Sequence, residues 1–292
     1  MSFEDKLVDT LGVDAKIKRA RINGYEINYL EAGSGQPLIM LHGLNIGWGQ
    51  WYKNIADLSK SFRVYALDMP GSGGSTKFNF AACDMERDLV ETIEGFIVGL
   101  GPGSFSVIGH SVGGWVALRL ALRGNISISK IVLSNPLGLV DHVPIRHMPI
   151  TIPFLAKFLS RTVMKASKKS MKSFLASVCH DPSSVSEVFS NYYYESVHRG
   201  KLSHPFMAMN RLFRPFALQR EFVLTPDLKN INNQVLVITG SHDFLVPHRK
   251  VQQAMNLLKN GRIVLIAETG HVPFIERPRE WNNIVQDFLL NT

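Results

Sequence analysis

The sequence predicts an α/β fold with a mostly parallel, doubly wound, eight-stranded sheet and an inserted helical segment. Short β-type runs alternate with helical patterns before residue 136, and the alternation resumes after Pro226. Strands that alternate with helices form βαβ units, whose parallel sheet is covered by helices on both faces. Residues 137–225 show helical apolar spacing and no strand signal, so we expect one sheet interrupted by a helical insert.

The expected elements follow from runs of apolar residues along the chain. Before the insert, the expected strands are 26–29, 37–41, 63–67, 105–108 and 131–133. The helices expected between them are 50–58, 84–98 and 112–122. After the insert, we expect strands at 234–239 and 262–266, a helix at 248–258 and a final helix that ends near Leu290. The sheet core is therefore expected to comprise residues 1–136 and 226–292.

Composition excludes several classes of protein. The 292 residues are 45% hydrophobic and 19% charged, which is globular rather than disordered. Cys83 and Cys179 are the only cysteines and lie far apart, so neither a disulfide framework nor a zinc site is indicated, and a reducing compartment fits best. The charged N-terminus does not resemble a secretory signal, and the uncharged stretch 95–118 is too rich in glycine for a membrane span. We expect a cytoplasmic protein whose mature chain starts near residue 1.

Positive charge is concentrated in the insert. Residues 137–225 carry +7 of the formal net charge of +8. There is no basic run with interleaved aromatic residues, so nucleic-acid binding is the weaker interpretation. Lys165, Lys168, Lys169 and Lys172 fall on one helical face, which favours a solvated surface. Contact of this basic face with an anionic membrane surface or an anionic substrate is the less favoured alternative.

The insert is also rich in large apolar side chains. Most of them are expected to pack between the insert helices and the sheet, while a few wall an apolar acyl or alkyl pocket. The spacing does not separate the two groups. They are Phe154, Phe158, Phe174, Phe189, Tyr192, Tyr193, Tyr194, Phe206, Met207, Met209, Phe213 and Phe216.

Ser111 occupies the centre of a Gly-x-Ser-x-Gly motif, Gly109-His110-Ser111-Val112-Gly113. The motif directly follows the strand 105–108 and directly precedes a helix. A turn this tight between a strand and a helix requires glycine on both sides, and it lifts the serine hydroxyl above the sheet edge. The string alone is modest evidence, but its position between strand and helix makes Ser111 the candidate nucleophile.

A serine hydroxyl needs a base to take its proton and a carboxylate to orient that base. Asp243 follows the strand 234–239, and His271 follows the strand 262–266. By itself Asp243 would be a turn or capping residue, and most isolated histidines are structural. Because all three residues follow the carboxyl ends of parallel strands in the chain order Ser, Asp, His, we expect Ser111, Asp243 and His271 to form a catalytic triad.

An oxyanion hole requires two backbone N–H groups aimed at the attacked carbonyl. His42-Gly43-Leu44-Asn45 follows the strand 37–41, and we expect the N–H of Leu44 to act together with that of Val112. His42 is expected to brace this loop rather than to ionise. An ordinary glycine turn is the alternative interpretation of the segment.

These motifs together resemble α/β-hydrolase fold enzymes with a helical cap, in a serine esterase or lipase-like form. The resemblance runs from about residue 22 to 290 and includes the His-Gly loop, Asp68-Met69-Pro70-Gly71-Ser72-Gly73, the Ser111 motif and Glu276-Arg277-Pro278. It implies that the insert 137–225, placed after the sixth strand, is a lid over the site. Some relatives carry their acid after the sixth strand, but here Ser134-Asn135-Pro136 stands there, which leaves Asp243 as the candidate.

The resemblance favours hydrolysis of a carboxylic ester with a small to medium apolar part. Epoxide hydrolases and haloalkane dehalogenases of this family carry aspartate where this chain has Ser111. Proline iminopeptidases and carbon–carbon bond hydrolases match weakly at Leu44-Asn45, and the latter also at Val272. Three alternatives stay open: carbon–carbon cleavage with the same triad, transfer of the acyl group to peroxide, and a ligand receptor with slow turnover.

No cofactor or metal is expected. The glycine-rich stretches 71–74 and 99–103 do not form a dinucleotide-binding or P-loop motif. His142, His147, His180, His198 and His204 lie in or near the insert without a metal-ligand spacing. The expected partner is a small-molecule ester, and the oligomeric state is not indicated.

Overall fold

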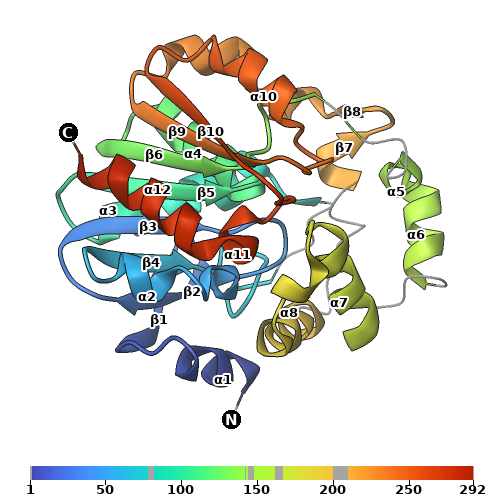
Figure 1. Ribbon diagram of the computed structural model, residues 1–292, viewed down its shortest axis with the longest axis horizontal. Helices are drawn as coiled ribbons and strands as arrows, with labels where there is room; N and C mark the ends of the chain where they lie inside the picture. The colour runs from blue at the N-terminus through green and yellow to red at the C-terminus, as the bar shows by residue number, and fades with distance from the viewer. Residues whose placement is uncertain are drawn as a thin grey trace.

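The computed structural model describes residues 2–77, 82–141, 143, 148–161, 167–199 and 210–291. Its centre is an eight-stranded sheet in the order β1-β2-β4-β3-β5-β6-β9-β10, shown in Figure 1. Strand β2 is antiparallel to both of its neighbours, and the other pairs are parallel. The predicted α/β fold class is confirmed. The strands are β1 (Ala15–Ile22), β2 (Tyr25–Ala32), β3 (Gln36–Leu41), β4 (Phe62–Leu67), β5 (Phe105–His110), β6 (Ile128–Ser134), β9 (Gln234–Gly240) and β10 (Gly261–Ile266).

Helices cover both faces of this sheet, as the predicted fold class requires. One face buries a core with a π-helical turn (Met85–Glu91), α3 (Thr92–Gly99), α4 (Val112–Arg123) and α10 (His248–Met255). The opposite face buries a second core, which includes Trp48, Trp51 and Trp281. Its helices are α1 (Phe3–Asp9), α2 (Ile55–Leu58), α11 (Pro273–Glu276) and α12 (Pro278–Leu290).

Strand β1 is an element that the sequence analysis did not locate. Its sequence, Ala-Lys-Ile-Lys-Arg-Ala-Arg-Ile, pairs with β2 along its whole length. Four of its eight side chains are Lys or Arg, and none of the eight is fully buried. Charged side chains are common on edge strands because they prevent pairing with another chain, and here they hide the apolar alternation.

The chain between β6 and β9 includes, among its described residues, the α-helices α5 to α8 and a short hairpin. The helices are α5 (Met148–Thr151), α6 (Pro153–Arg161), α7 (Lys168–Ser177) and α8 (Glu187–Arg199). They lie together on one side of the sheet, with α5 and α6 farthest from it (Figure 1). The expectation of no strand in this region was wrong, because β7 (Phe213–Arg214) pairs with β8 (Ala217–Leu218). Two-residue strands are too short to give an alternation in the sequence.

Parallel pairing brings the carboxyl ends of the central strands together. Leu41 of β3 pairs with Gly109 of β5, and His110 pairs with Ser134 of β6. On the other side, Ser134 pairs with Ile238 of β9, whose end at Gly240 pairs with β10. The loops that follow these strands therefore meet at one edge of the sheet. In the described part of the chain, no helix is long and apolar enough to cross a membrane.

Candidate active site

Ser111 lies in the tight turn between β5 and α4. Its backbone has φ 51° and ψ −114°, a region that residues other than glycine rarely adopt. A Cβ at Gly109 would lie 2.4 Å from the carbonyl oxygen of Gly113, and a Cβ at Gly113 would lie 2.3 Å from that of Leu41. Both distances are far below van der Waals contact, so the turn requires glycine on each side of Ser111, as the sequence analysis expected.

Asp243 and His271 form a hydrogen-bonded pair. The Nδ1 atom of His271 lies 2.7 Å from Oδ2 of Asp243, and both side chains are buried. The other oxygen of Asp243 accepts hydrogen bonds from the backbone N–H groups of Leu245 and Val246. These bonds fix the carboxylate, which in turn fixes the orientation and the tautomer of the imidazole. The pairing leaves Nε2 of His271 as the nitrogen available for proton transfer.

The backbone of His271 is held by residues that the sequence analysis did not single out for this role. Its N–H donates to the carbonyl of Val178, in the loop after α7. Its carbonyl accepts from Nε2 of His110 at 3.0 Å and from Nδ2 of Asn135 at 2.8 Å. Asn135 also accepts from the N–H of Gly240 through its side-chain oxygen. His110 and Asn135 each come shortly after an expected strand. This position was the sequence signal that could have identified them as candidates.

The loop after β3 passes over Ser111. A Cβ at Gly43 would lie 2.7 Å from Nδ1 of His110 and 3.6 Å from Cβ of Ser111, so only glycine allows this approach. The N–H of Gly43 donates to Oε1 of Gln50, which is fully buried. Leu44 and Val112, the two expected oxyanion-hole residues, line the same cavity as Ser111.

His42 braces this loop, as the sequence analysis expected. Its Nε2 accepts a hydrogen bond from the backbone N–H of Met69, and its Nδ1 lies 2.5 Å from the carbonyl oxygen of Gly43. A neutral imidazole with its proton on Nδ1 satisfies both contacts. Burial lowers the pKa of His42 to about 4. Burial also holds the pKa of His110 well below its ordinary value.

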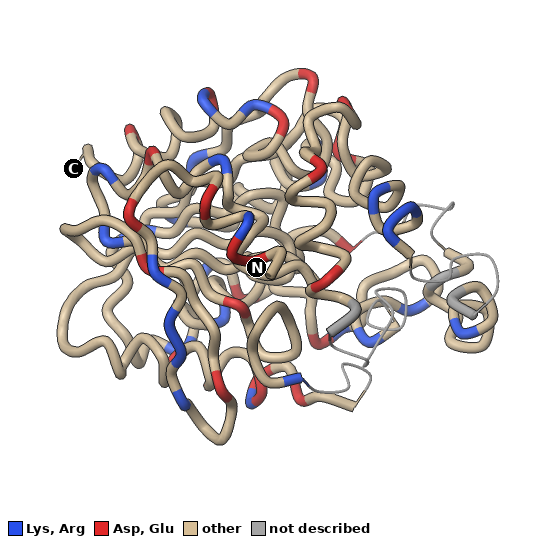
Figure 2. Tube along the Cα trace, turned by 90° about the horizontal axis from the view of Figure 1, so that it is seen from below, with Lys and Arg blue, Asp and Glu red and all other residues tan. Residues whose placement is uncertain are grey.

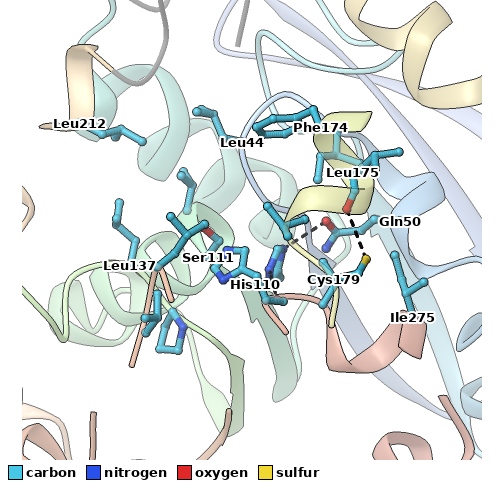
Figure 3. Close-up of a pocket in the computed structure, with 18 of the residues that line it drawn as sticks. Leu44, Gln50, His110, Ser111, Leu137, Phe174, Leu175, Cys179, Leu212 and Ile275 are labelled. Atoms are coloured by element: carbon cyan, nitrogen blue, oxygen red, sulfur yellow. Dashed lines mark hydrogen bonds between the residues drawn. The ribbon is translucent and has the colours of Figure 1, made fainter. Parts of the chain in front are cut away.

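Ser111 and His271 open into an apolar cavity (Figure 3). It encloses about 1120 Å³, including the part that is open to solvent. Among the described residues that line it there is no Asp, Glu, Lys or Arg, and its polar lining side chains are Gln50, His110, Ser111, Cys179 and His271. Burial raises the pKa of the Cys179 thiol to about 12, so this cysteine is not an activated nucleophile.

The large apolar residues of the insert were expected to be either core or pocket wall, and this expectation was wrong for three of them, which are exposed. Phe174, Phe189 and Phe213 line the cavity. Tyr192 and Tyr193 belong to the buried core, whereas Phe154, Phe158 and Phe216 are exposed. Phe206, Met207, Met209 and Lys165 lie outside the described residues.

Glu276 joins the insert to the loop that carries His271. One of its oxygens accepts from the N–H of Gly270 at 2.7 Å. The other accepts from the N–H groups of His180 and Asp181 at 2.7 and 2.8 Å. Burial raises the pKa of Glu276, while the three N–H donors favour its charged form. Lys53 makes a second connection, because its Nζ donates to the carbonyls of Ser184 and Ile275.

In the described part of the chain, no three His, Cys, Asp or Glu side chains are grouped so that they could hold a metal ion. His142, His147 and His204 lie outside that part.

The fold and the chain order of Ser111, Asp243 and His271 are those of the α/β hydrolases. The family model of the alpha/beta hydrolase fold matches residues 36–278, so the chain belongs to this hydrolase family.

The chain is similar to proteins that act on different bonds. It is 26% identical to a 2-hydroxy-6-oxo-6-phenylhexa-2,4-dienoate hydrolase of Comamonas testosteroni, over 94% of this chain and 95% of that protein. It is also 26% identical to a pimeloyl-[acyl-carrier protein] methyl ester esterase of Nitrosomonas europaea, over 85% of this chain and 94% of that protein. Among solved structures, a carboxylesterase of Bacillus subtilis superposes with a TM-score of 0.79 at 19% identity, covering 98% of this chain and 95% of that one.

Proposed function

We propose that the protein is a serine hydrolase that cleaves a carboxylic ester with a small to medium apolar acyl part. Ser111 is the nucleophile, His271 the general base and Asp243 the residue that orients it. The N–H groups of Leu44 and Val112 form the oxyanion hole. Residues 1–136 and 226–292 are the hydrolase core, and residues 137–225 are a helical cap over the site.

The reaction proceeds in two halves. Nε2 of His271 takes the hydroxyl proton as Oγ of Ser111 attacks the ester carbonyl. The oxyanion that forms accepts hydrogen bonds from the two backbone N–H groups. The tetrahedral intermediate collapses to an acyl-enzyme when His271 returns the proton to the leaving alkoxide. The same histidine then activates a water molecule, which releases the acid and restores Ser111. Throughout, Asp243 stabilises the imidazolium that forms.

One observation carries the proposal: Ser111 and His271, whose imidazole is hydrogen-bonded to Asp243, line a cavity whose described lining has no Asp, Glu, Lys or Arg. An apolar wall of Leu137, Phe174, Leu175 and Leu212 suits an alkyl or aryl acyl group. Such a cavity favours a neutral substrate, because an anion buried without a partner is strongly destabilised.

Carbon–carbon bond hydrolysis is the second candidate. The similarity to the dienoate hydrolase of Comamonas testosteroni favours it, as that relative covers almost the whole chain. A dienoate carries a carboxylate, and the described lining of the cavity has no Lys or Arg to receive one. For that reason we place ester hydrolysis first.

The test is a panel of p-nitrophenyl esters of graded acyl length, run beside a vinylogous diketone that carries a carboxylate and beside a peroxide assay. We expect ester turnover that peaks at one acyl length, because the cavity has a fixed size. Turnover of the diketone at a higher kcat/KM than any ester would replace the proposal by carbon–carbon cleavage. Faster acyl transfer to peroxide than to water would identify a perhydrolase. Turnover far below about 1 per second on every substrate, with tight ligand binding, would identify a receptor.

A further inference from the structure

Helix α6 exposes two aromatic rings. The side chain of Phe154 is 79% exposed and that of Phe158 is 54% exposed. The two residues are four apart, so they lie on the same face of the helix, and the exposed Lys157 lies beside them. Scattered surface apolar residues are ordinary, but neighbouring large rings on one helix face form a patch of the kind that binds a partner.

The charge of the sequence on either side of α6 has one sign. Residues 142–180 contain seven Lys and Arg and no Asp or Glu over 39 positions. Lys157 of α6 and Lys168, Lys169 and Lys172 of α7 are exposed. The sequences of α6 and α7 contain no Asp or Glu. Figure 2 shows how Lys and Arg (blue) and Asp and Glu (red) are distributed along the chain. Lys168 also packs over the rings of Phe3 and Tyr194, which holds the start of α7 against the N-terminal helix and α8.

We propose that this surface, formed by α6 and the exposed lysines of α7, docks onto an anionic lipid bilayer. The rings of Phe154 and Phe158 enter the boundary between headgroups and acyl chains. The ammonium groups of the lysines reach the phosphates of anionic lipids, and their methylene chains lie along the same boundary. A bilayer accepts apolar and cationic groups without a shaped pocket. An acidic protein surface would pair with the lysines but would offer no apolar environment to the two rings. The observations therefore favour a lipid bilayer.

The docking surface shares a helix with the cavity. Phe174 and Leu175 of α7 line the cavity, whereas Lys169 and Lys172 of the same helix point to solvent. A docked α7 would therefore have lipid on one face and the cavity on another. The substrate that this arrangement suits is an ester borne by the lipid phase. This substrate class rests on the proposed ester hydrolysis, whereas docking itself does not.

The first test is co-sedimentation of the protein with vesicles of phosphatidylcholine alone and with vesicles that also contain phosphatidylglycerol. We expect binding to the anionic vesicles only, and we expect added salt to weaken it because it screens the lysines. The Phe154→Ser/Phe158→Ser variant should bind at least about tenfold more weakly, since each ring loses its place in the boundary. The Lys169→Glu/Lys172→Glu variant should lose roughly fivefold or more for each lysine.

Two matched variants serve as controls. Val98→Ser/Leu265→Ser removes exposed apolar groups from α3 and β10, and Lys16→Glu/Lys259→Glu reverses two exposed charges away from the insert. All variants should keep the melting temperature of the parent protein. Absence of binding, equal binding to both kinds of vesicle, or equal weakening in the controls would overturn the docking surface.

A second measurement separates the substrate class from the docking surface. We expect a vesicle-borne ester to be hydrolysed faster when the vesicle contains phosphatidylglycerol, and the Lys169→Glu/Lys172→Glu variant to lose this gain but keep its activity on a water-soluble ester. Hydrolysis of water-soluble esters with no hydrolysis of the vesicle-borne one would overturn the substrate class alone. No hydrolysis of any ester would count against the proposed function, and the binding result would stand independently.

Discussion

Asp243 illustrates how one side chain can be fixed for a chemical role. One of its oxygens accepts hydrogen bonds from two backbone N–H groups, and the other accepts a hydrogen bond from Nδ1 of His271. We expect Asp243→Asn to leave the fold intact and to reduce kcat by roughly 10⁴-fold, because the amide favours the wrong tautomer of the imidazole. The variant should be compared with the parent by steady-state kinetics and thermal unfolding. A loss of less than tenfold with an unchanged melting temperature would contradict the role assigned to Asp243.

His42 should make the free energy of unfolding depend on pH. The unfolded chain takes up a proton on His42 near pH 6.5, whereas folded His42 stays neutral down to about pH 4. Because the folded pKa is depressed, this contribution is fully present above pH 6.5 and is lost as the pH falls toward 4. The expected loss is about 3 kcal/mol. Because the pKa of His110 is also depressed, acidification lowers the free energy of unfolding through His110 as well.

Urea unfolding at about pH 7.5 and about pH 5 checks this expectation in the parent protein and in His42→Asn. The variant should be less stable at the higher pH and should lose less stability on acidification. Parallel losses in the two proteins would show that His42 does not remain neutral in the folded state.

At the scale of elements, the contact between α4 and β3 depends on Gly113. A Cβ there would lie 2.3 Å from the carbonyl oxygen of Leu41 and 2.6 Å from that of His42, and backbone cannot move aside as a flexible side chain can. We expect Gly113→Ala to lower the free energy of unfolding by about 1–3 kcal/mol and to reduce turnover, because the helix start that carries Val112 is displaced.

Gly99→Ala is the matched control for Gly113→Ala. Gly99 ends α3, and a Cβ there would meet no atom closer than 3.9 Å. This substitution should be neutral or stabilising by up to about 1 kcal/mol. Denaturant unfolding and ester turnover should be measured for both variants, and equal effects would contradict the steric account of the turn.

Glu276 is a positioning residue between the insert and the His271 loop. The Glu276→Gln side chain has one acceptor oxygen in place of two, so it cannot hold Gly270 and the pair His180 and Asp181 together. We expect kcat to fall by up to roughly 100-fold, because His271 is displaced, with a smaller change in KM.

The control for Glu276→Gln is Glu268→Gln, an exposed carboxylate whose salt bridge to Arg277 lies on the surface. That variant should retain the kcat and KM of the parent. A Glu276→Gln enzyme with parental kcat but raised KM would mean that Glu276 shapes substrate binding rather than the position of His271.

The elements that could be predicted are those that give a local signal. Buried strands and the serine motif are contiguous in sequence, so the sheet strands other than β1 and the turn around Ser111 could be expected from the chain alone. The contacts of Asn135 and Glu276 could not, because each joins segments that are far apart in sequence. The hairpin β7–β8 was missed because a pair of two-residue strands leaves no periodicity.

In the molecule as a whole, the insert is hydrogen-bonded to two parts of the candidate site, the loop that carries His271 and the loop after β3. Val178 accepts the N–H of His271, and Tyr192 of α8 accepts the N–H of Gly49 in the loop after β3. Ser196 of α8 donates to the carbonyl of Ile46 in that same loop. We infer that α7 and α8 are a fixed wall of the cavity and that substrate size is set by their packing. Side-chain packing of this kind has no periodicity, so the sequence could predict the pocket but not its lining.

The proposed function assigns the role of nucleophile to Ser111. The most direct measurement is mass spectrometry of the protein after reaction with a fluorophosphonate, which bonds covalently to an activated serine. We expect one adduct, on the peptide that contains Ser111, no adduct in Ser111→Ala, and much slower labelling in His271→Ala. Ester turnover in Ser111→Ala should fall by roughly 10⁶-fold. An adduct on another residue, or ester turnover that survives in Ser111→Ala, would contradict the account.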